Sequence, residues 1–151
     1  MGLFPDIHTA AVARGPFGCF SWRMPKQILI VEDEADFQEL LRYHLATSEC
    51  EVSVAASFAE AMTQAGRIRP DLILLDIMLP DVDGLSLCEA LKTEPALVEA
   101  PIWIISAAHS QTTRDIARAS GAVEFLSKPV DFKLLKTRVA EWLHLPPKLA
   151  A

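Results

Sequence analysis

The chain has 151 residues, of which 51% are hydrophobic and 23% charged, and its formal net charge is −6. We expect one soluble domain without a membrane span, since no apolar run approaches the roughly 20 residues that a membrane-spanning helix needs. The acidic balance argues against a nucleic-acid-binding surface, which is usually basic. The three cysteines include no CxxC pair and are interpreted as reduced thiols of a cytoplasmic protein.

Residues 1–24 differ from the rest of the chain. They show no helical or alternating pattern and include two prolines and three glycines. They also lack the basic start and the continuous apolar stretch of a signal peptide. We expect a disordered arm or a misannotated start over 1–24, a folded domain over 25–145 and a short tail over 146–151.

Short apolar runs and segments with apolar residues at helical spacing alternate after Lys26. In chain order, they predict strands and helices in turn over residues 27–31, 37–45, 51–56, 58–65, 71–76, 87–91, 102–106, 116–119, 122–127 and 132–143. Gly66 and Pro70 are expected to end the second helix. Gly84 is expected to allow the bend into the third helix, and Gly121 to close the fourth.

Alternating strands and helices with right-handed crossovers predict an α/β fold, in which helices cover both faces of a parallel sheet. The run 27–31 is apolar throughout, which suits a strand buried on both faces. In such sheets, ligands bind beyond the carboxyl ends of the strands, where the strand order reverses. The residues at those ends are therefore the candidate functional residues.

Polar side chains follow four of the five predicted strands. Glu32 and Asp33 follow the first strand, and Asp76 follows the third. Ser106 ends the fourth strand, and Lys128 follows the fifth. We expect these side chains to meet at one edge of the sheet, where the carboxylates repel one another unless a cation binds.

A cluster of oxygen ligands without histidine or cysteine favours a hard cation, Mg²⁺ or Mn²⁺. Such an ion can bridge a carboxylate and a phosphoryl oxygen, while Lys128 and Ser106 contact other phosphoryl oxygens. Asp76 is then the expected nucleophile and forms an aspartyl phosphate. Each residue also has a simpler interpretation: Glu32 and Asp33 as acids near a helix N-terminus, Ser106 as a satisfied hydroxyl and Lys128 as solvated surface.

Four segments occur in order and at a characteristic spacing: "ILIVEDE", "DLILLDIMLPDVDG", "IISAA" and "GAVEFLSKPVD". Through them, residues 26–145 resemble the receiver domain of bacterial two-component response regulators. The resemblance implies a flavodoxin-like fold, a doubly wound five-stranded parallel sheet in strand order 2-1-3-4-5 with five helices in three α/β/α layers. It also indicates a receiver of the stand-alone, single-domain type over 25–145.

The resemblance also implies roles for individual residues. Asp76 is expected to be the phospho-acceptor, and Lys128 to assist it. Mg²⁺ is expected to bind Asp33 directly, Glu32 through water, Asp76 and the backbone carbonyl of Met78. The switch residues are then Ser106, Phe125 and Pro129, with a cis peptide bond between Lys128 and Pro129. Phe125 taken alone would equally suit the hydrophobic core.

The implied function is phosphorelay signal transduction rather than enzymatic turnover. A histidine kinase or a histidine phosphotransfer protein would donate the phosphoryl group to Asp76. The face formed by the fourth helix, fifth strand and fifth helix would then contact a downstream target protein, without a DNA-binding domain. A phosphoryl shuttle or sink without its own output is the alternative. Met78 and Ala108 lack a group to orient an attacking water, so slow self-dephosphorylation is expected.

Asp81 and Asp83 raise an alternative of another class. The segment "DVDGL" resembles the first motif of haloacid-dehalogenase phosphatases, in which two acids follow a strand directly. Here Pro80 and two further residues separate these acids from the strand, whereas Asp76 leaves it directly. Asp81 and Asp83 are therefore interpreted as solvated turn residues.

Overall fold

The computed structural model describes residues 24–79 and 83–145, together with the backbone of residues 14–15 and 18–19. Five parallel strands form the main sheet: β3 (Lys26–Val31), β4 (Cys50–Ala55), β5 (Leu72–Leu75), β6 (Ile102–Ser106) and β7 (Glu124–Ser127). Their order is β4-β3-β5-β6-β7. This confirms the predicted order 2-1-3-4-5. The chain adds β4 on one side of β3 and then adds β5, β6 and β7 in turn on the other side.

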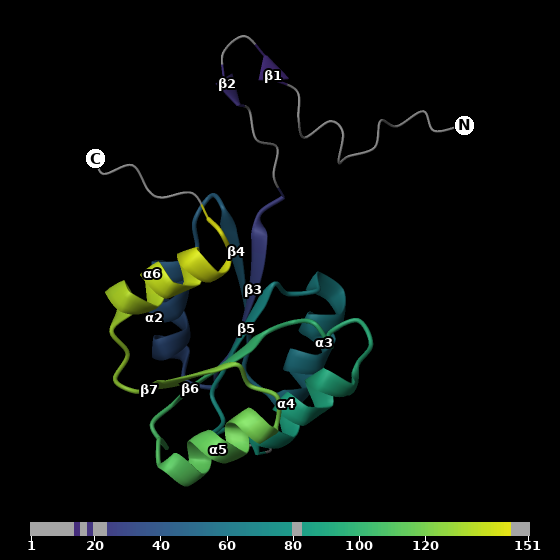
Figure 1. The fold of residues 1–151 in the computed structure, drawn as a ribbon, viewed down its shortest axis with the longest axis vertical. Helices are drawn as coiled ribbons and strands as arrows, with labels where there is room; N and C mark the ends of the chain where they lie inside the picture. The colour runs from purple at the N-terminus through teal and green to yellow at the C-terminus, as the bar shows by residue number, and fades with distance from the viewer. Residues whose placement is uncertain (1–13, 16–17, 20–23, 80–82, 146–151) are drawn as a thin grey trace.

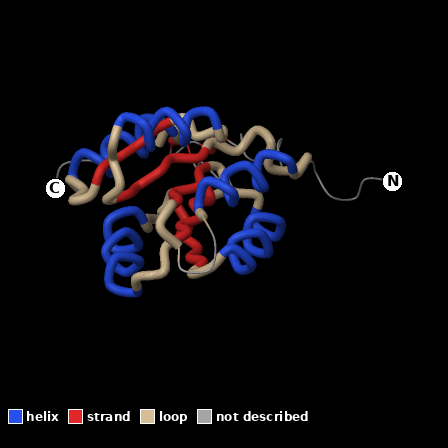
Figure 2. Tube along the Cα trace, turned by 90° about the horizontal axis from the view of Figure 1, so that it is seen from below, coloured by secondary structure: helices blue, strands red, loops and turns tan. Residues whose placement is uncertain are grey.

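Five helices cover the sheet: α2 (Ala35–Leu45), α3 (Phe58–Ile68), α4 (Gly84–Thr93), α5 (Gln111–Ala119) and α6 (Phe132–Trp142). Helices α2 and α6 pack on one face, and α3, α4 and α5 pack on the other (Figure 1). Figure 2 shows the same arrangement from below, with helices on either side of the strands. The fold is therefore the predicted three-layer α/β/α arrangement.

Strand β3 shows why the strands read as continuous apolar runs. Leu29 and Val31 lie in the core under α3, α4 and α5, whereas Ile28 and Ile30 lie in the core under α2 and α6. All four are fully buried. Successive side chains of a strand point to opposite faces, so a strand covered on both sides needs apolar residues at every position.

The prediction that Gly66 helps to end its helix was wrong. Helix α3 continues through Gly66 to Ile68, and Arg69 then takes a left-handed conformation with φ of 48° while its N–H bonds the Ala65 carbonyl. Pro70 follows this turn. The amphipathic packing of α3 outweighs the small helix penalty of one glycine.

The N-terminal segment is described only in part. Arg14–Gly15 (β1) and Gly18–Cys19 (β2) pair as a two-stranded antiparallel ladder that is separate from the main sheet. The rest of the prediction for 1–24, and the predicted tail over 146–151, lie outside the described residues. Among the described helices, none combines the length and the apolar character required to cross a membrane.

Candidate phosphoryl-transfer site

The strand register brings the predicted site residues to one edge of the sheet. Val31 is paired with Leu75, so the residues that follow them, Glu32 and Asp76, leave adjacent strands side by side. The Asp76 N–H also donates a hydrogen bond of 3.0 Å to the Val31 carbonyl. The predicted convergence of these strand ends is thus observed in the fold.

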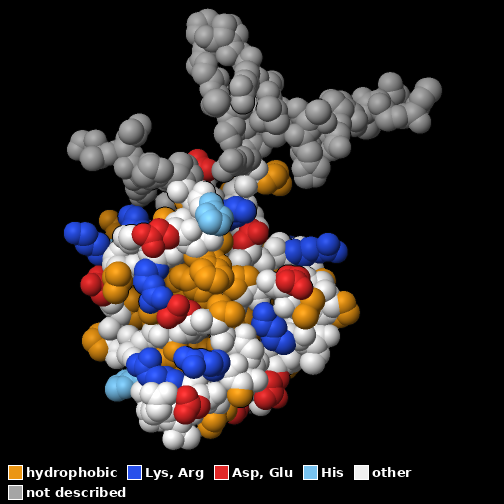
Figure 3. Space-filling model, viewed as in Figure 1, with side chains coloured by type: hydrophobic (Ala, Val, Ile, Leu, Met, Phe, Trp, Pro, Cys, Tyr) orange, Lys and Arg blue, Asp and Glu red, His pale blue; other side chains and the backbone are white. Residues whose placement is uncertain are grey.

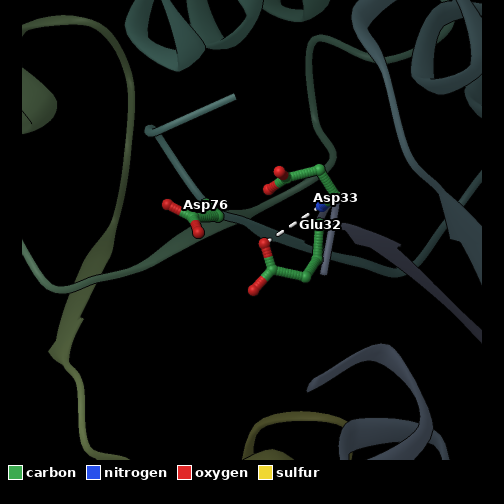
Figure 4. Close-up of side chains that lie close together, drawn as sticks. All are labelled: Glu32, Asp33 and Asp76. Atoms are coloured by element: carbon green, nitrogen blue, oxygen red, sulfur yellow. Dashed lines mark hydrogen bonds between the residues drawn. The ribbon is translucent and has the colours of Figure 1, made fainter. Parts of the chain in front are cut away.

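Three carboxylates share this edge. One carboxylate oxygen from each of Glu32, Asp33 and Asp76 lies within 4.8 Å of the other two. Figure 4 shows these side chains grouped around a common space. Glu32 and Asp76 are buried, with relative exposures of 1% and 7%, whereas Asp33 is exposed. The cluster therefore combines two desolvated acids with one that opens to solvent.

Lys128 connects the two buried carboxylates. Its Nζ lies 2.8 Å from Glu32 Oε1 and 3.0 Å from Asp76 Oδ2. The same ammonium lies 4.3 Å from the centroid of the Phe37 ring, on the face of α2 that packs toward the sheet. A single ammonium thus offsets part of the charge of three acids and is held between carboxylates and an aromatic face.

Burial sets the electrostatics of this group. Desolvation raises the pKa of Glu32 to about 7, although the hydrogen bond from Lys128 opposes the shift. Burial lowers the pKa of the Lys128 ammonium, but its hydrogen bonds to Glu32 and Asp76 raise that pKa by more, so the net shift is upward. Burial of the Glu32 carboxylate therefore outweighs its bond to Lys128, and the neighbouring Asp76 raises the Glu32 pKa further.

Backbone and amide groups fix the orientation of the carboxylates. The Asp33 N–H donates to Glu32 Oε2 at 3.1 Å, and the Met78 N–H donates to Asp76 Oδ1 at 2.8 Å. The Gln38 side-chain amide donates to the Glu32 backbone carbonyl. Asp76 is thus held at both oxygens: Oδ1 accepts from the Met78 N–H of its own turn, and Oδ2 accepts from Lys128.

The donor set suits a hard divalent cation. Each member of the cluster offers a carboxylate oxygen, and these atoms are close enough to share one ion. Excess negative charge and oxygen-only ligands favour Mg²⁺ or Mn²⁺ over softer metals. Glu32, Asp33 and Asp76 therefore fit the predicted metal site. The contribution of the Met78 carbonyl stays a prediction.

The remaining predicted residues lie on β6 and β7 or directly after β7. Ser106 is fully buried, and its hydroxyl accepts a hydrogen bond of 3.1 Å from the Ala108 N–H. The Lys128 N–H donates to the Ser106 carbonyl at 3.0 Å, which places the ends of β6 and β7 together. The Lys128–Pro129 peptide bond is cis, as predicted. Phe125 lies on β7, where it is half-buried against the core.

The acids of the alternative motif do not join the cluster as far as they are described. Asp83 is exposed and caps α4, where its Oδ1 accepts a hydrogen bond of 3.0 Å from the Leu85 N–H. This bond satisfies a free amide at the start of the helix. Asp81 lies outside the described residues.

Three residues that contact the site or the predicted switch residues were not predicted from the sequence. Phe37 was interpreted as a core residue at helical spacing, and nothing local marks it as a partner of Lys128. Gln38 lies on α2, and Arg114 lies on α5 with its guanidinium 4.9 Å from the centroid of the Phe125 ring; polar side chains on helices usually face solvent. Their partners are distant in the chain or belong to the backbone, so sequence pattern alone gives no signal for them.

Residues 28–140 match the family model described as the response regulator receiver domain. Among curated proteins, the chain is 38% identical over 116 residues to the response regulator PleD of Caulobacter vibrioides. That match covers 77% of this chain but 26% of PleD, so the chain spans about a quarter of that relative's length.

Solved structures show the same similarity. The phosphorylated cyanobacterial phytochrome response regulator RcpA gives a TM-score of 0.73 at 27% identity, covering 82% of this chain and 98% of RcpA. The Mn²⁺-bound form of the response regulator Rcp1 gives 0.71 at 25% identity, covering 83% of this chain and all of Rcp1, at 100%. Each match covers more than four fifths of the chain.

Proposed function

The chain belongs to the response regulator receiver domain family of two-component signalling, and we propose that Asp76 is the residue on which it accepts a phosphoryl group. The observation that supports this most is the arrangement around Asp76, which is buried at the end of β5 between Lys128 and the Glu32–Asp33 pair. Buried acids held beside further acids and a lysine are typical of functional sites.

The proposed reaction is a phosphoryl transfer from a phosphohistidine. The P–N bond to the histidine breaks as a P–O bond to Asp76 forms, and the imidazole nitrogen leaves with the electron pair. The Lys128 ammonium, already 3.0 Å from Asp76 Oδ2, neutralises charge on the phosphoryl oxygens. Glu32, Asp33, Asp76 and the Met78 carbonyl would hold Mg²⁺ or Mn²⁺, which supplies further charge neutralisation.

The donor is a histidine kinase or a histidine phosphotransfer protein in the cytoplasm. The phosphoryl group carries up to two negative charges, in place of the single charge of the carboxylate, and brings new acceptor oxygens beside Lys128. Ser106 moves toward these oxygens, and Phe125 turns into the space that Ser106 leaves. We call Ser106 and Phe125 the switch pair. Their movement alters the surface formed by α5, β7 and α6, through which the domain contacts a target protein.

Two features of the comparisons support this proposal. RcpA is described in its phosphorylated form, and Rcp1 is described with Mn²⁺ bound. Both cover at least 82% of this chain, and the cluster of Glu32, Asp33 and Asp76 lies within residues 28–140, which match the family model. A phosphatase that uses Asp83 is disfavoured, since that carboxylate caps α4.

The test is labelling by a phosphorylated histidine kinase or phosphotransfer protein, with and without Mg²⁺. We expect Asp76→Asn to abolish labelling, and chelation of Mg²⁺ to abolish it in the unaltered protein. Asp83→Asn is the matched control, because it makes the same change of charge in the adjacent turn. Undiminished labelling of Asp76→Asn would refute the assignment. Return of the label to a histidine, without any change in partner affinity, would indicate a shuttle.

A further inference from the structure

Arg114 of α5 contacts three separate parts of the region around the switch pair. Its guanidinium Cζ lies 4.9 Å from the centroid of the Phe125 ring. Its Nη2 donates a hydrogen bond of 2.8 Å to the Ser127 hydroxyl of β7, and its Nε donates one of 3.2 Å to the His109 carbonyl. One side chain therefore joins α5 to β7 and to the loop that follows Ser106.

Ser106 and Arg114 are bound to the same loop, so the position of Ser106 shows which arrangement of this loop the Arg114 bond accompanies. The Ser106 hydroxyl accepts a hydrogen bond from the Ala108 N–H, so it belongs to the same loop that Arg114 grips at His109. In the proposed switch, a movement of Ser106 toward a phosphoryl group on Asp76 would break the bond to Ala108, which anchors this loop. The bond between Arg114 and His109 is observed in the arrangement in which Ser106 is bound to its own loop.

Phe125 is held between the core and Arg114. The ring packs against the core under α3, α4 and α5, and it also borders a groove of 230 Å³ between α5 and β7 that Arg114 and Arg118 line. Basic side chains lie over the lower part of the face in Figure 3, where Figure 1 places α5 and β7. If the ring turns inward, it gives up its contact with the guanidinium, because that group is tied to Ser127 and His109.

We propose that Arg114 is a positioning residue that holds Phe125 and the loop after Ser106 in the unphosphorylated arrangement. It thereby sets how readily the domain adopts the phosphorylated arrangement. This inference rests on the proposed function of Asp76 and of the switch pair. A contact made in only one of two states lowers the population of the other, and by linkage it weakens whatever binds that other state by the same factor.

The test is the rate at which Asp76 is labelled by acetyl phosphate in the presence of Mg²⁺, in which the aspartyl phosphate forms as acetate leaves. Arg114→Met keeps an unbranched apolar stem but removes the guanidinium. We expect it to label roughly three- to tenfold faster than the unaltered protein. We also expect the NMR signals of the Phe125 ring to shift toward those of the phosphorylated unaltered protein.

Three further variants make the result specific. Arg118→Met is the matched control, since it removes the same charge from the same groove one turn along α5, and its rate should not change. Arg114→Lys keeps the charge without the planar fork of donors, so its labelling rate should lie between the rates of the unaltered protein and of Arg114→Met. Ser127→Ala removes a single bond from Arg114 and should give a smaller increase, which also tests the idea if Arg114→Met folds poorly.

Two results would overturn the inference. A rate for Arg114→Met equal to that of Arg118→Met would show that Arg114 does not bias the switch. A slower rate would show that Arg114 supports the phosphorylated arrangement instead. Both differ from a failure of the proposed function, in which Asp76→Asn would keep its label under the same conditions.

Discussion

Replacement of Gly84 by alanine is expected to destabilise the domain and to disturb the phospho-acceptor. Gly84 begins α4, and its N–H donates a hydrogen bond of 3.0 Å to the Ile77 carbonyl. A Cβ at Gly84 would lie closest to the Ile77 Cα, and it would also lie 2.9 Å from the Asp76 carbonyl oxygen and 2.9 Å from the Ile77 carbonyl carbon. All three neighbours are backbone atoms, so the start of α4 or the end of β5 must move. Gly84 was expected to allow a bend, but its structural role is this close approach.

The expected cost follows from the kind of clash. Overpacking of a buried site costs typically 1–3 kcal/mol, and a clash against backbone belongs at the upper end of that range, so we expect a loss of about 3 kcal/mol in the free energy of unfolding. Gly66→Ala is the matched control. A Cβ at Gly66 meets nothing within 4 Å and lies inside α3, so we expect a gain of about 1 kcal/mol.

Urea denaturation followed by far-ultraviolet circular dichroism measures both changes. The two variants add the same methyl group, so changes of opposite sign in the free energy of unfolding reflect the different surroundings of the two glycines and not the chemistry of the added group. We also expect Gly84→Ala to label more slowly at Asp76, because the backbone of the acceptor shifts. A Gly84→Ala protein as stable as the unaltered one would refute the steric argument. Loss of stability in Gly66→Ala would contradict the description of α3.

Three further predictions concern the site. Burial raises the pKa of Glu32 to about 7. The protonated Glu32 side chain therefore stabilises the metal-free protein fully below about pH 4.5, and this contribution to the free energy of unfolding is lost as pH rises through 7. Glu32→Gln should remove this pH dependence when denaturation is measured from about pH 4 to 8. Lys128→Met should slow labelling of Asp76 by about a hundredfold while Mg²⁺ binding, measured by calorimetry, persists; an unchanged rate would exclude Lys128 from the reaction. The isolated phosphoprotein should lose its label slowly, because Met78 and Ala108 offer no side-chain group to orient water, and rapid loss in a time course would contradict this.

The backbone arrangement was predictable because local pattern and long-range packing agree. Strand β3 is apolar at each position from Ile28 to Val31, and each of these residues is buried on one of the two faces. The convergence of Glu32, Asp76 and Lys128 was predictable for a related reason. Each follows a strand, and parallel strands end at the same edge of the sheet.

Other features depend on contacts that no local pattern records. Phe37 lies under the Lys128 ammonium, and Arg114 contacts Phe125, only because helices α2 and α5 dock at particular positions on the sheet. Gly66 resembled a helix terminator in the sequence, but the packing of α3 overrides its weak preference. Side chains on helix surfaces acquire their partners from tertiary structure, so their roles appear only once the fold is known.

The central claim is that the phosphoryl group is attached to Asp76. The most direct measurement is to label the protein, reduce the acyl phosphate with borohydride and locate the modified residue by peptide mass spectrometry. The account predicts one modified position, Asp76, in place of which homoserine is found. Modification at Asp33 or Asp83, with Asp76 recovered intact, would contradict it.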